Sequence, residues 1–223
     1  MKISLVVIGD EILLGQVTDT NSGEIARTVS VANWTVSRVF IVGDDAEEIK
    51  YAINAALEAS DVVITTGGLG PTKDDITKSV LLDIFGGKLI QNEYVLRNVE
   101  EVCRRRHIVL NDLTRTQALV PSTARIIQNK VGTAPVMWFE KKCGDKGKVL
   151  VTMPGFADTP PPMATVLTPV CLTALSSLSR RMAIIVACND AARSALFSSI
   201  KFGFSFTASR RVYRNDVFSP LKL

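Results

Sequence analysis

The segment at residues 62–78 combines a glycine-rich turn with a pair of carboxylates. A run of apolar and β-branched residues ends in a turn with three glycines between residues 66 and 70, and Asp74 and Asp75 follow where a helix begins. Glycines let the backbone come close to a ligand, and the start of a helix offers unpaired N–H groups to an anion. Carboxylates beside a bound anion can hold a cation against it. These residues indicate a site for a phosphorylated ligand.

The first 85 residues alternate between strand and helix patterns. Strands are predicted at residues 2–8, 35–42 and 61–66, because these runs are rich in β-branched and apolar side chains. Helices are predicted at residues 21–32, 46–59 and 75–85, with Thr20 at the N-cap of the first. Strand and helix in strict alternation predict an α/β fold with a mostly parallel sheet.

The following residues, up to Met153, change to a different pattern. A helix is predicted at residues 93–106, with Leu96, Val99 and Cys103 facing inward and a basic end. Short strands are predicted at residues 125–128, 135–140 and 148–153, and the polar residues 141–147 read as a hairpin turn between the last two. We expect these strands to extend one edge of the sheet.

Acidic residues follow the glycines at the ends of the first two predicted strands, in Gly9-Asp10-Glu11 and Gly43-Asp44-Asp45. The carboxyl ends of parallel strands share one edge of a sheet, where ligands of such folds bind. The acidic groups should therefore converge near the glycine turn, and a divalent cation such as Mg²⁺ is implied because carboxylates repel a phosphate. The plainer interpretation is that both aspartate pairs cap helices and that the two adjacent glycines only form a tight turn.

Composition excludes several other classes of function. His107 is the only histidine and follows an arginine run on an exposed helix, so a Ser/His triad is improbable. Residues 1–155 carry 18 basic and 19 acidic side chains, which gives no support for nucleic-acid binding. No apolar run approaches the roughly 18 residues of a membrane helix. The four cysteines lack metal-binding spacing and are expected to be free thiols in a cytoplasmic protein.

Five motifs in register resemble the N-terminal domain of CinA, the competence/damage-inducible protein, which belongs to the molybdopterin-binding (MoaB/MogA/MoeA-like) superfamily. They lie at residues 9–22, 66–78, 117–121, 129–135 and 153–155. Leu69 stands where the molybdopterin enzymes have threonine, which is the CinA form of the turn. The resemblance implies a three-layer α/β/α domain over residues 1–155 with a mostly parallel sheet.

The same resemblance implies metal-dependent hydrolysis of ADP-ribose to AMP and ribose 5-phosphate, with Mg²⁺, Mn²⁺ or Co²⁺ as cofactor. The open alternatives are a molybdopterin or nucleotide-binding module without catalysis, an adenylyl-transfer-type enzyme, and a scaffold that only oligomerises. Expected partners are a small nucleotide or pterin ligand and further copies of the chain. The implied catalytic residues are Asp75, Glu11 and Lys78, with Lys73 as an alternative to Lys78; the implied metal ligands are Asp10, Glu11, Asp74 and Asp75; and the implied substrate contacts are Gly67, Gly68, Gly70, Thr72, Asn21, Asn129, Gly132 and Thr133.

The resemblance ends after Gly155. Residues 156–223 contain no glutamate, hold six of the nine phenylalanines, and carry three consecutive prolines at residues 160–162 where the family has an acid and a helix. An abrupt change of this kind is what a shifted reading frame produces, and we expect these residues to be an aberrant tail; a divergent or linker segment is the alternative. The nicotinamide mononucleotide deamidase domain common in the family is expected to be absent, together with its activity.

Overall fold

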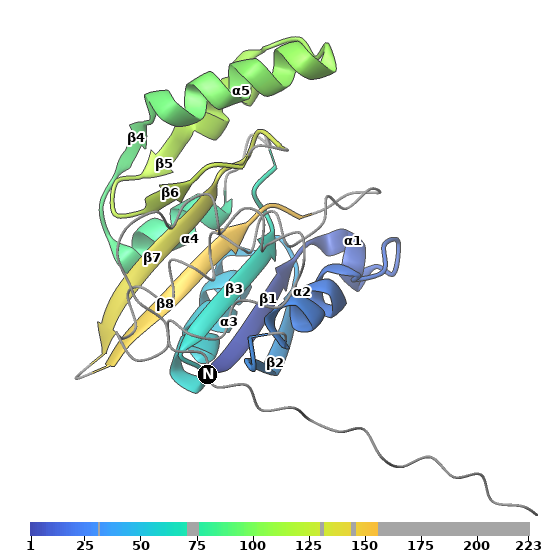
Figure 1. Cartoon of the computed structure of the whole chain (residues 1–223), viewed down its shortest axis with the longest axis vertical. Helices are drawn as coiled ribbons and strands as arrows, with labels where there is room; N and C mark the ends of the chain where they lie inside the picture. Colours follow the sequence, from blue (N-terminus) through green and yellow to red (C-terminus); the bar gives the residue numbers. More distant parts are fainter. Residues whose placement is uncertain (31, 71–75, 130–131, 144–145, 156–223) are drawn as a thin grey trace, which may run out of the picture. The chain divides into compact units, whose positions relative to one another are not determined.

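Six strands form one sheet in the order β2-β1-β3-β8-β7-β6 (Figure 1). The computed structural model describes residues 1–30, 32–70, 76–129, 132–143 and 146–155. The expected tail at residues 156–223 lies outside the described residues, and so do Thr72, Lys73, Asp74 and Asp75. The strands are β1 (Lys2–Ile8), β2 (Thr35–Val42), β3 (Val62–Gly67), β6 (Arg125–Ile127), β7 (Val136–Cys143) and β8 (Lys146–Met153).

Parallel pairing joins four adjacent strands of this sheet, from the edge strand β2 to β8. β1 pairs in parallel with β2 and β3, and β3 pairs in parallel with β8. β7 returns antiparallel to β8, and β6 runs antiparallel to β7. The prediction that later strands extend one edge of the sheet is confirmed. The predicted hairpin is also confirmed, although its strands extend to Cys143 and Lys146, beyond the expected ends.

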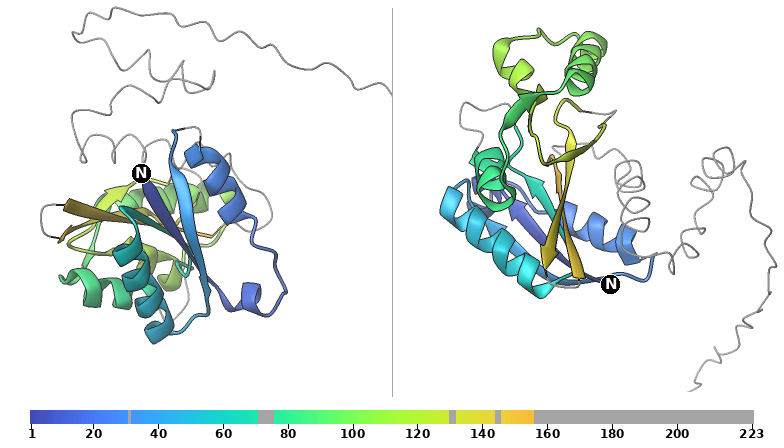
Figure 2. Two further views of the ribbon diagram at one scale, coloured as in Figure 1. Left: turned by 90° about the horizontal axis from the view of Figure 1, so that it is seen from below. Right: turned by 90° about the vertical axis from the view of Figure 1, so that its left-hand side faces the viewer.

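Helices cover both faces of the sheet. The helix α3 (Ala46–Ala59) and the helix α4 (Ile76–Phe85) pack on one face, and α2 (Asn21–Ser30) packs on the other (Figure 2). A single turn, α1 (Asp10–Leu13), follows β1. The buried apolar side chains accordingly divide into two clusters, one on each face. This arrangement confirms the predicted three-layer α/β/α fold.

Side-chain hydrogen bonds to the backbone lie at the starts of α3 and α2. Asp45 accepts hydrogen bonds from the backbone N–H groups of Glu47 and Glu48, each at 3.0 Å, so the capping interpretation of this aspartate is confirmed. In α2 the carbonyl of Thr20 accepts from the N–H of Glu24 at 3.1 Å, which places Thr20 at the expected cap position. The side-chain bond there comes from Asp19, whose Oδ1 accepts from the N–H of Ser22 at 3.0 Å.

A small lobe with its own two-stranded sheet follows α4. Its antiparallel strands are β4 (Leu89–Gln91) and β5 (Leu119–Pro121), and between them lie α5 (Glu93–Arg106), α6 (Asp112–Arg115) and a short 3₁₀ helix, η1 (Thr116–Ala118). The sequence predicted α5 at its observed bounds but neither short strand. Val99 and Cys103 are buried in the α3 and α4 side cluster and Leu96 packs against it, as predicted.

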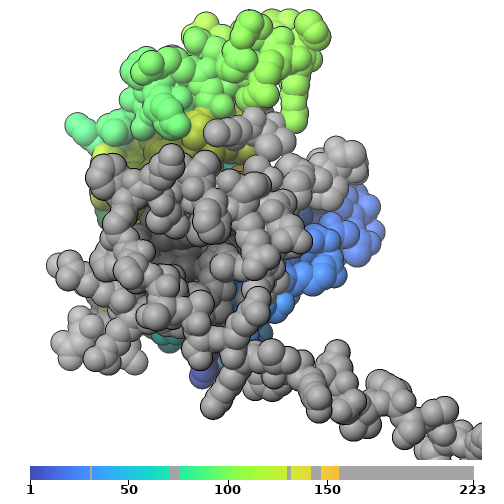
Figure 3. All heavy atoms as spheres, viewed as in Figure 1, coloured from blue at the N-terminus to red at the C-terminus, as the bar shows by residue number. Residues whose placement is uncertain are grey.

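The basic end of α5 is exposed to solvent, and α5 belongs to the green region at the top of Figure 3. Arg104 forms an ion pair with Glu101, and its guanidinium, mainly through this hydrogen bond, lowers the pKa of the Glu101 carboxyl below its ordinary value. His107 is the exposed left-handed C-cap, with φ of 54°. Both observations agree with a solvated helix end.

Two further observations concern the state of a cysteine and the search for membrane-spanning helices. Cys103 is a free, buried thiol, as expected for it. Within the part of the chain that the structure describes, no helix is both long enough and apolar enough to cross a membrane.

Replacing Leu5 with alanine tests the core. Leu5 lies in the middle of β1 with none of its surface exposed, so Leu5→Ala should lower the free energy of unfolding by about 2–5 kcal/mol through lost burial and a residual cavity. Leu14→Ala makes the same substitution at a residue that is 70% exposed. It should change the free energy of unfolding by less than about 0.5 kcal/mol. Urea unfolding of both variants measures the difference, and equal losses would contradict this description of the core.

Candidate functional site

The glycine turn begins where the end of β3 lies directly against β1. Gly67 pairs in register with Ile8, and a Cβ atom at Gly67 would stand 2.0 Å from the carbonyl oxygen of Ile8. Gly67 also has φ of 93°, a conformation that L side chains rarely adopt. The next residue, Gly68, has φ of 63°, and its Cβ would lie 2.4 Å from Oγ1 of Thr77. The sequence therefore needs glycine at both positions to bring this backbone together.

The strand ends around this turn share one edge of the sheet, as predicted. The parallel order of β2, β1, β3 and β8 brings Gly43, Gly9, Gly67 and Pro154 to the same edge. A Cβ at Gly155 would be 3.4 Å from the Cα of Gly67, so the chain after β8 passes next to the glycine turn. We call this edge, at the carboxyl ends of β1, β2, β3, β6 and β8, the rim.

Two acidic residues after β1 have different surroundings on the rim. Oδ1 of Asp10 accepts from the N–H of Asp44 at 3.1 Å, and Oδ2 of Asp44 accepts from the N–H of Asp10 at 3.4 Å. The carboxylate of Glu11 instead turns back over Gly9, with Oε1 2.6 Å from the position a Cβ would take there. Asp10 thus ties the ends of β1 and β2 together, whereas Glu11 makes no side-chain hydrogen bond among the described residues.

Two of the four predicted metal ligands, Asp74 and Asp75, lie outside the described residues. Among the residues that are described, no group of three or more His, Cys, Asp or Glu side chains is placed to hold a metal ion. Asp10 and Glu11 therefore do not form such a site alone. Their assignment as metal ligands stays a prediction that depends on Asp74 and Asp75.

Two of the predicted substrate contacts lie on the rim, Asn21 at the start of α2 and Asn129 in the loop after β6. Nδ2 of Asn21 donates to Oγ1 of Thr66 at 3.4 Å, which places the start of α2 beside the glycine turn. Asn129 is 5% exposed, and its amide bonds within its own loop, accepting from the N–H of Gly132 at 3.1 Å and donating to the carbonyl of Ala134 at 3.0 Å. Asn129 thus shapes this loop, and its contact with a ligand, like those of Gly132 and Thr133, stays a prediction.

Asn98 of α5 holds the same loop from the small lobe. Its Nδ2 donates to the carbonyls of Asn129 at 2.9 Å and Gly132 at 3.2 Å. Asn98 was not predicted from the sequence, because its bonds join positions more than thirty residues apart. The small lobe is therefore attached to the rim by side-chain hydrogen bonds to the loop backbone.

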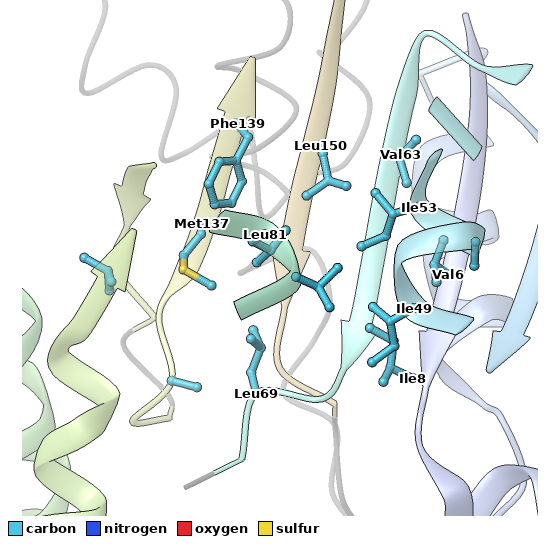
Figure 4. Packing of buried hydrophobic residues seen from close by; sticks show 14 of the residues in the cluster. Val6, Ile8, Ile49, Ile53, Val63, Leu69, Leu81, Met137, Phe139 and Leu150 are labelled. Atoms are coloured by element: carbon cyan, nitrogen blue, oxygen red, sulfur yellow. The ribbon is translucent and has the colours of Figure 1, made fainter. Parts of the chain in front are cut away.

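Lys78 lies in the first turns of α4 and is almost completely buried, with 1% of its surface exposed. Its Nζ donates to the carbonyl oxygen of Thr116 in η1 at 3.2 Å. This bond brings the small lobe to the start of α4. Leu69 of the glycine turn lies in the same buried cluster as Leu81 of α4 and Ile8 of β1 (Figure 4). Apolar packing thus fixes the position of the turn. The helix that follows the turn in sequence carries the buried ammonium group of Lys78.

Several buried polar atoms near the rim have no hydrogen-bond partner. Thr77 and Gln117 are each 1% exposed, and neither the Thr77 hydroxyl nor either amide atom of Gln117 is paired. The predicted site included neither residue. The available signals were that Thr77 stands two positions after the aspartate pair and that Gln117 opens one of the five motifs. Unpaired buried side-chain atoms also occur in Ser22, Thr65, Gln128 and Thr152.

The fold and rim define an α/β/α domain with a glycine turn between β3 and α4. The family model described as "Probable molybdopterin binding domain" matches residues 4–173. A solved structure of CinA from Thermoplasma acidophilum, itself of unknown function, superposes with a TM-score of 0.64 at 32% identity, covering 78% of this chain and 98% of that one. The chain therefore belongs to the molybdopterin-binding domain family, as a CinA N-terminal domain.

Two further relatives show how far the likeness extends. A CinA-like protein of Flavobacterium psychrophilum is 42% identical over 158 residues, which cover 70% of this chain and 36% of that protein. The chain thus spans about a third of the length of the curated relative. The structure of the tungsten cofactor synthesizing protein MoaB of Pyrococcus furiosus superposes with a TM-score of 0.52 at 19% sequence identity. The match covers 78% of this chain and 94% of MoaB, and it shows the fold alone.

The family match continues beyond the expected boundary at residue 155, to residue 173. The described residues end at Gly155. The boundary and the shifted-frame interpretation of the tail therefore stay predictions.

Gly67→Ala tests the close approach of β3 to β1. A side chain there meets the Ile8 carbonyl and requires a strained backbone, so we expect the free energy of unfolding to fall by more than about 2 kcal/mol. Gly70→Ala is the control, because among the described residues no atom beyond its chain neighbours lies within 4 Å of its Cβ position; this substitution should lower the free energy of unfolding by less than about 0.5 kcal/mol. Chemical denaturation measures both, and a Gly67→Ala protein of wild-type stability would show that this crossing does not constrain the fold.

Proposed function

We propose that this domain binds a nucleotide through its phosphate groups at the glycine turn and hydrolyses a diphosphate linkage, with ADP-ribose cleaved to AMP and ribose 5-phosphate. The observation that carries the proposal is the approach of the Gly67 backbone to Ile8, with the glycine turn between β3 and α4 on the rim. Ligands of parallel α/β sheets bind at this edge, and N–H groups at a helix start suit phosphate oxygens.

The charges around the turn support a phosphorylated ligand. The ammonium group of Lys78 is buried in the helix that follows the turn, where positive charge would neutralise a phosphate or the leaving oxygen. Glu11 has a carboxylate that makes no side-chain hydrogen bond among the described residues. A carboxylate on this rim suits a phosphate ligand when a cation lies between them.

The residues expected to hold a divalent metal are Glu11 and Asp75, with Asp10 and Asp74 as further candidates. The described residues fit this role in part, because Glu11 has an exposed carboxylate whereas one oxygen of Asp10 is already bonded to Asp44. When bound, Mg²⁺, Mn²⁺ or Co²⁺ would neutralise phosphate charge and lower the pKa of a coordinated water. Within the described part, the protein's own contribution is to orient the diphosphate through the turn.

The second candidate function is a pterin or nucleotide-binding module without turnover. The observation that favours it is that the family is named for molybdopterin binding. Self-association, expected from the sequence, is a further proposal for either candidate. The two functions share a ligand site and differ in whether a bond is broken.

Hydrolysis of ADP-ribose with one metal at a time separates the two candidates. We expect the purified chain to release AMP and ribose 5-phosphate with at least one of Mg²⁺, Mn²⁺ and Co²⁺, and to lose at least about 100-fold in rate in Asp75→Asn, since a metal ligand is removed. Asp83→Asn changes an exposed aspartate near the other end of α4, ion-paired to Lys50, and should keep the rate. AMP binding without any product would support the module, and equal rates in Asp75→Asn and wild type would refute the assigned role of Asp75.

A further inference from the structure

Thr77 and Gln117 are buried polar side chains that have no hydrogen-bond partner among the described residues. Each is 1% exposed, and the Thr77 hydroxyl and both amide atoms of Gln117 have no hydrogen-bond partner. Most buried polar side chains in folded proteins are paired, and an unpaired one is costly because it has lost its hydration. Two such residues therefore call for a partner outside the described part of the protein.

Both residues adjoin the glycine turn or the start of α4. Oγ1 of Thr77 lies 2.4 Å from the position that a Cβ would take at Gly68, so this hydroxyl lies against the glycine turn, and Cγ2 of Ile8 lies 2.9 Å from the same position. Gln117 follows Thr116, whose carbonyl accepts from Nζ of Lys78 at 3.2 Å. The Lys78 bond thus brings Gln117 of the small lobe to the helix that carries Thr77.

The unpaired hydroxyls of Thr65 and Thr152 have a simpler explanation. These two threonines are register partners on the adjacent parallel strands β3 and β8. Register partners have their side chains on the same face and close together, so a small rotation pairs one hydroxyl with the other. Thr77 and Gln117 lie on helices with no such partner. Thr65 therefore serves as a control for Thr77.

We propose that Thr77 and Gln117 contact the ligand, Thr77 at the phosphate and Gln117 at the edge of the purine or pterin ring. A hydroxyl beside the glycine turn can donate to a phosphate oxygen. A phosphate offers only acceptors and would leave Oε1 of Gln117 unpaired, whereas a ring edge with a donor next to an acceptor satisfies both amide atoms. The proposal rests on the ligand site of the proposed function but not on hydrolysis.

Binding of three probes to four variants tests the proposal, using calorimetry on the full chain with Mg²⁺ present. The probes are AMP, ribose 5-phosphate and pyrophosphate. Gln117→Leu should weaken the binding of AMP at least about tenfold and leave the affinities for ribose 5-phosphate and pyrophosphate unchanged, because only AMP carries the ring. Thr77→Val should weaken all three by about tenfold, because all carry phosphate. Gln91→Leu in the exposed strand β4 and Thr65→Val in β3 make the same substitutions and should leave all affinities unchanged.

Thermal unfolding without ligand gives a second test of the same variants. If the polar groups are unpaired, Gln117→Leu and Thr77→Val should raise Tm by about 2–4 °C, because each removes a buried group that lacks a partner. A fall in Tm would mean that the protein or an internal water pairs these groups, which overturns the proposal.

The remaining outcomes separate this proposal from the proposed function. Three results would each overturn the assignment of Gln117 to a ring edge. Gln117→Leu could lose binding of ribose 5-phosphate, or it could bind all three probes more weakly by the same factor. The third such result is that the wild type binds none of the probes. AMP binding that depends on Gln117, in a chain that never cleaves ADP-ribose, would support this inference and remove the proposed hydrolysis.

Discussion

The contact between the backbone of Gly67 and the carbonyl of Ile8 is the constraint on which the rim depends. A Cβ at Gly67 would lie 2.0 Å from that oxygen, so any other residue would push the end of β3 away from β1. The parallel pairing of these strands in register ends at this point, with Ile8 opposite Gly67. The position at which β3 ends beside β1 therefore determines where the glycine turn begins. It also determines which residues the turn contacts, among them Ile8 and Thr77.

Apolar packing transmits this constraint to the small lobe. Leu69, two residues after Gly67, is 2% exposed and belongs to the cluster that also contains Ala118 and Ala134. The glycine turn, η1 and the loop after β6 thus share one buried core. The bonds from Asn98 to that loop and from Lys78 to Thr116 add polar links between the same segments. The positions of Gln117 and Asn129 therefore depend on hydrophobic burial as much as on the polar residues themselves.

The sequence predicted those parts of the fold that local patterns determine. The bounds of β1, β2, α3 and α5 were predicted as observed, because each is long and has regular apolar spacing. The three-residue strands β4 and β5 were missed, since so few residues show no period. The convergence of strand ends followed from parallel topology and is confirmed. The pairing of Asp10 with Asp44 and the burial of Thr77 and Gln117 were not predictable, because they arise between segments distant in sequence.

Acidic residues at strand ends have two physical uses, and the rim contains an example of each. Asp10 accepts from the backbone of Asp44, so one of its oxygens is occupied in joining β1 to β2. Glu11, the next residue, makes no side-chain hydrogen bond among the described residues and lies over Gly9, where the missing side chain leaves room. A carboxylate that already accepts a backbone hydrogen bond contributes less to a cation than one that does not. Of the two, Glu11 is therefore the better candidate for contact with a ligand or its metal, and Asp10 the better candidate for a role in shaping the rim.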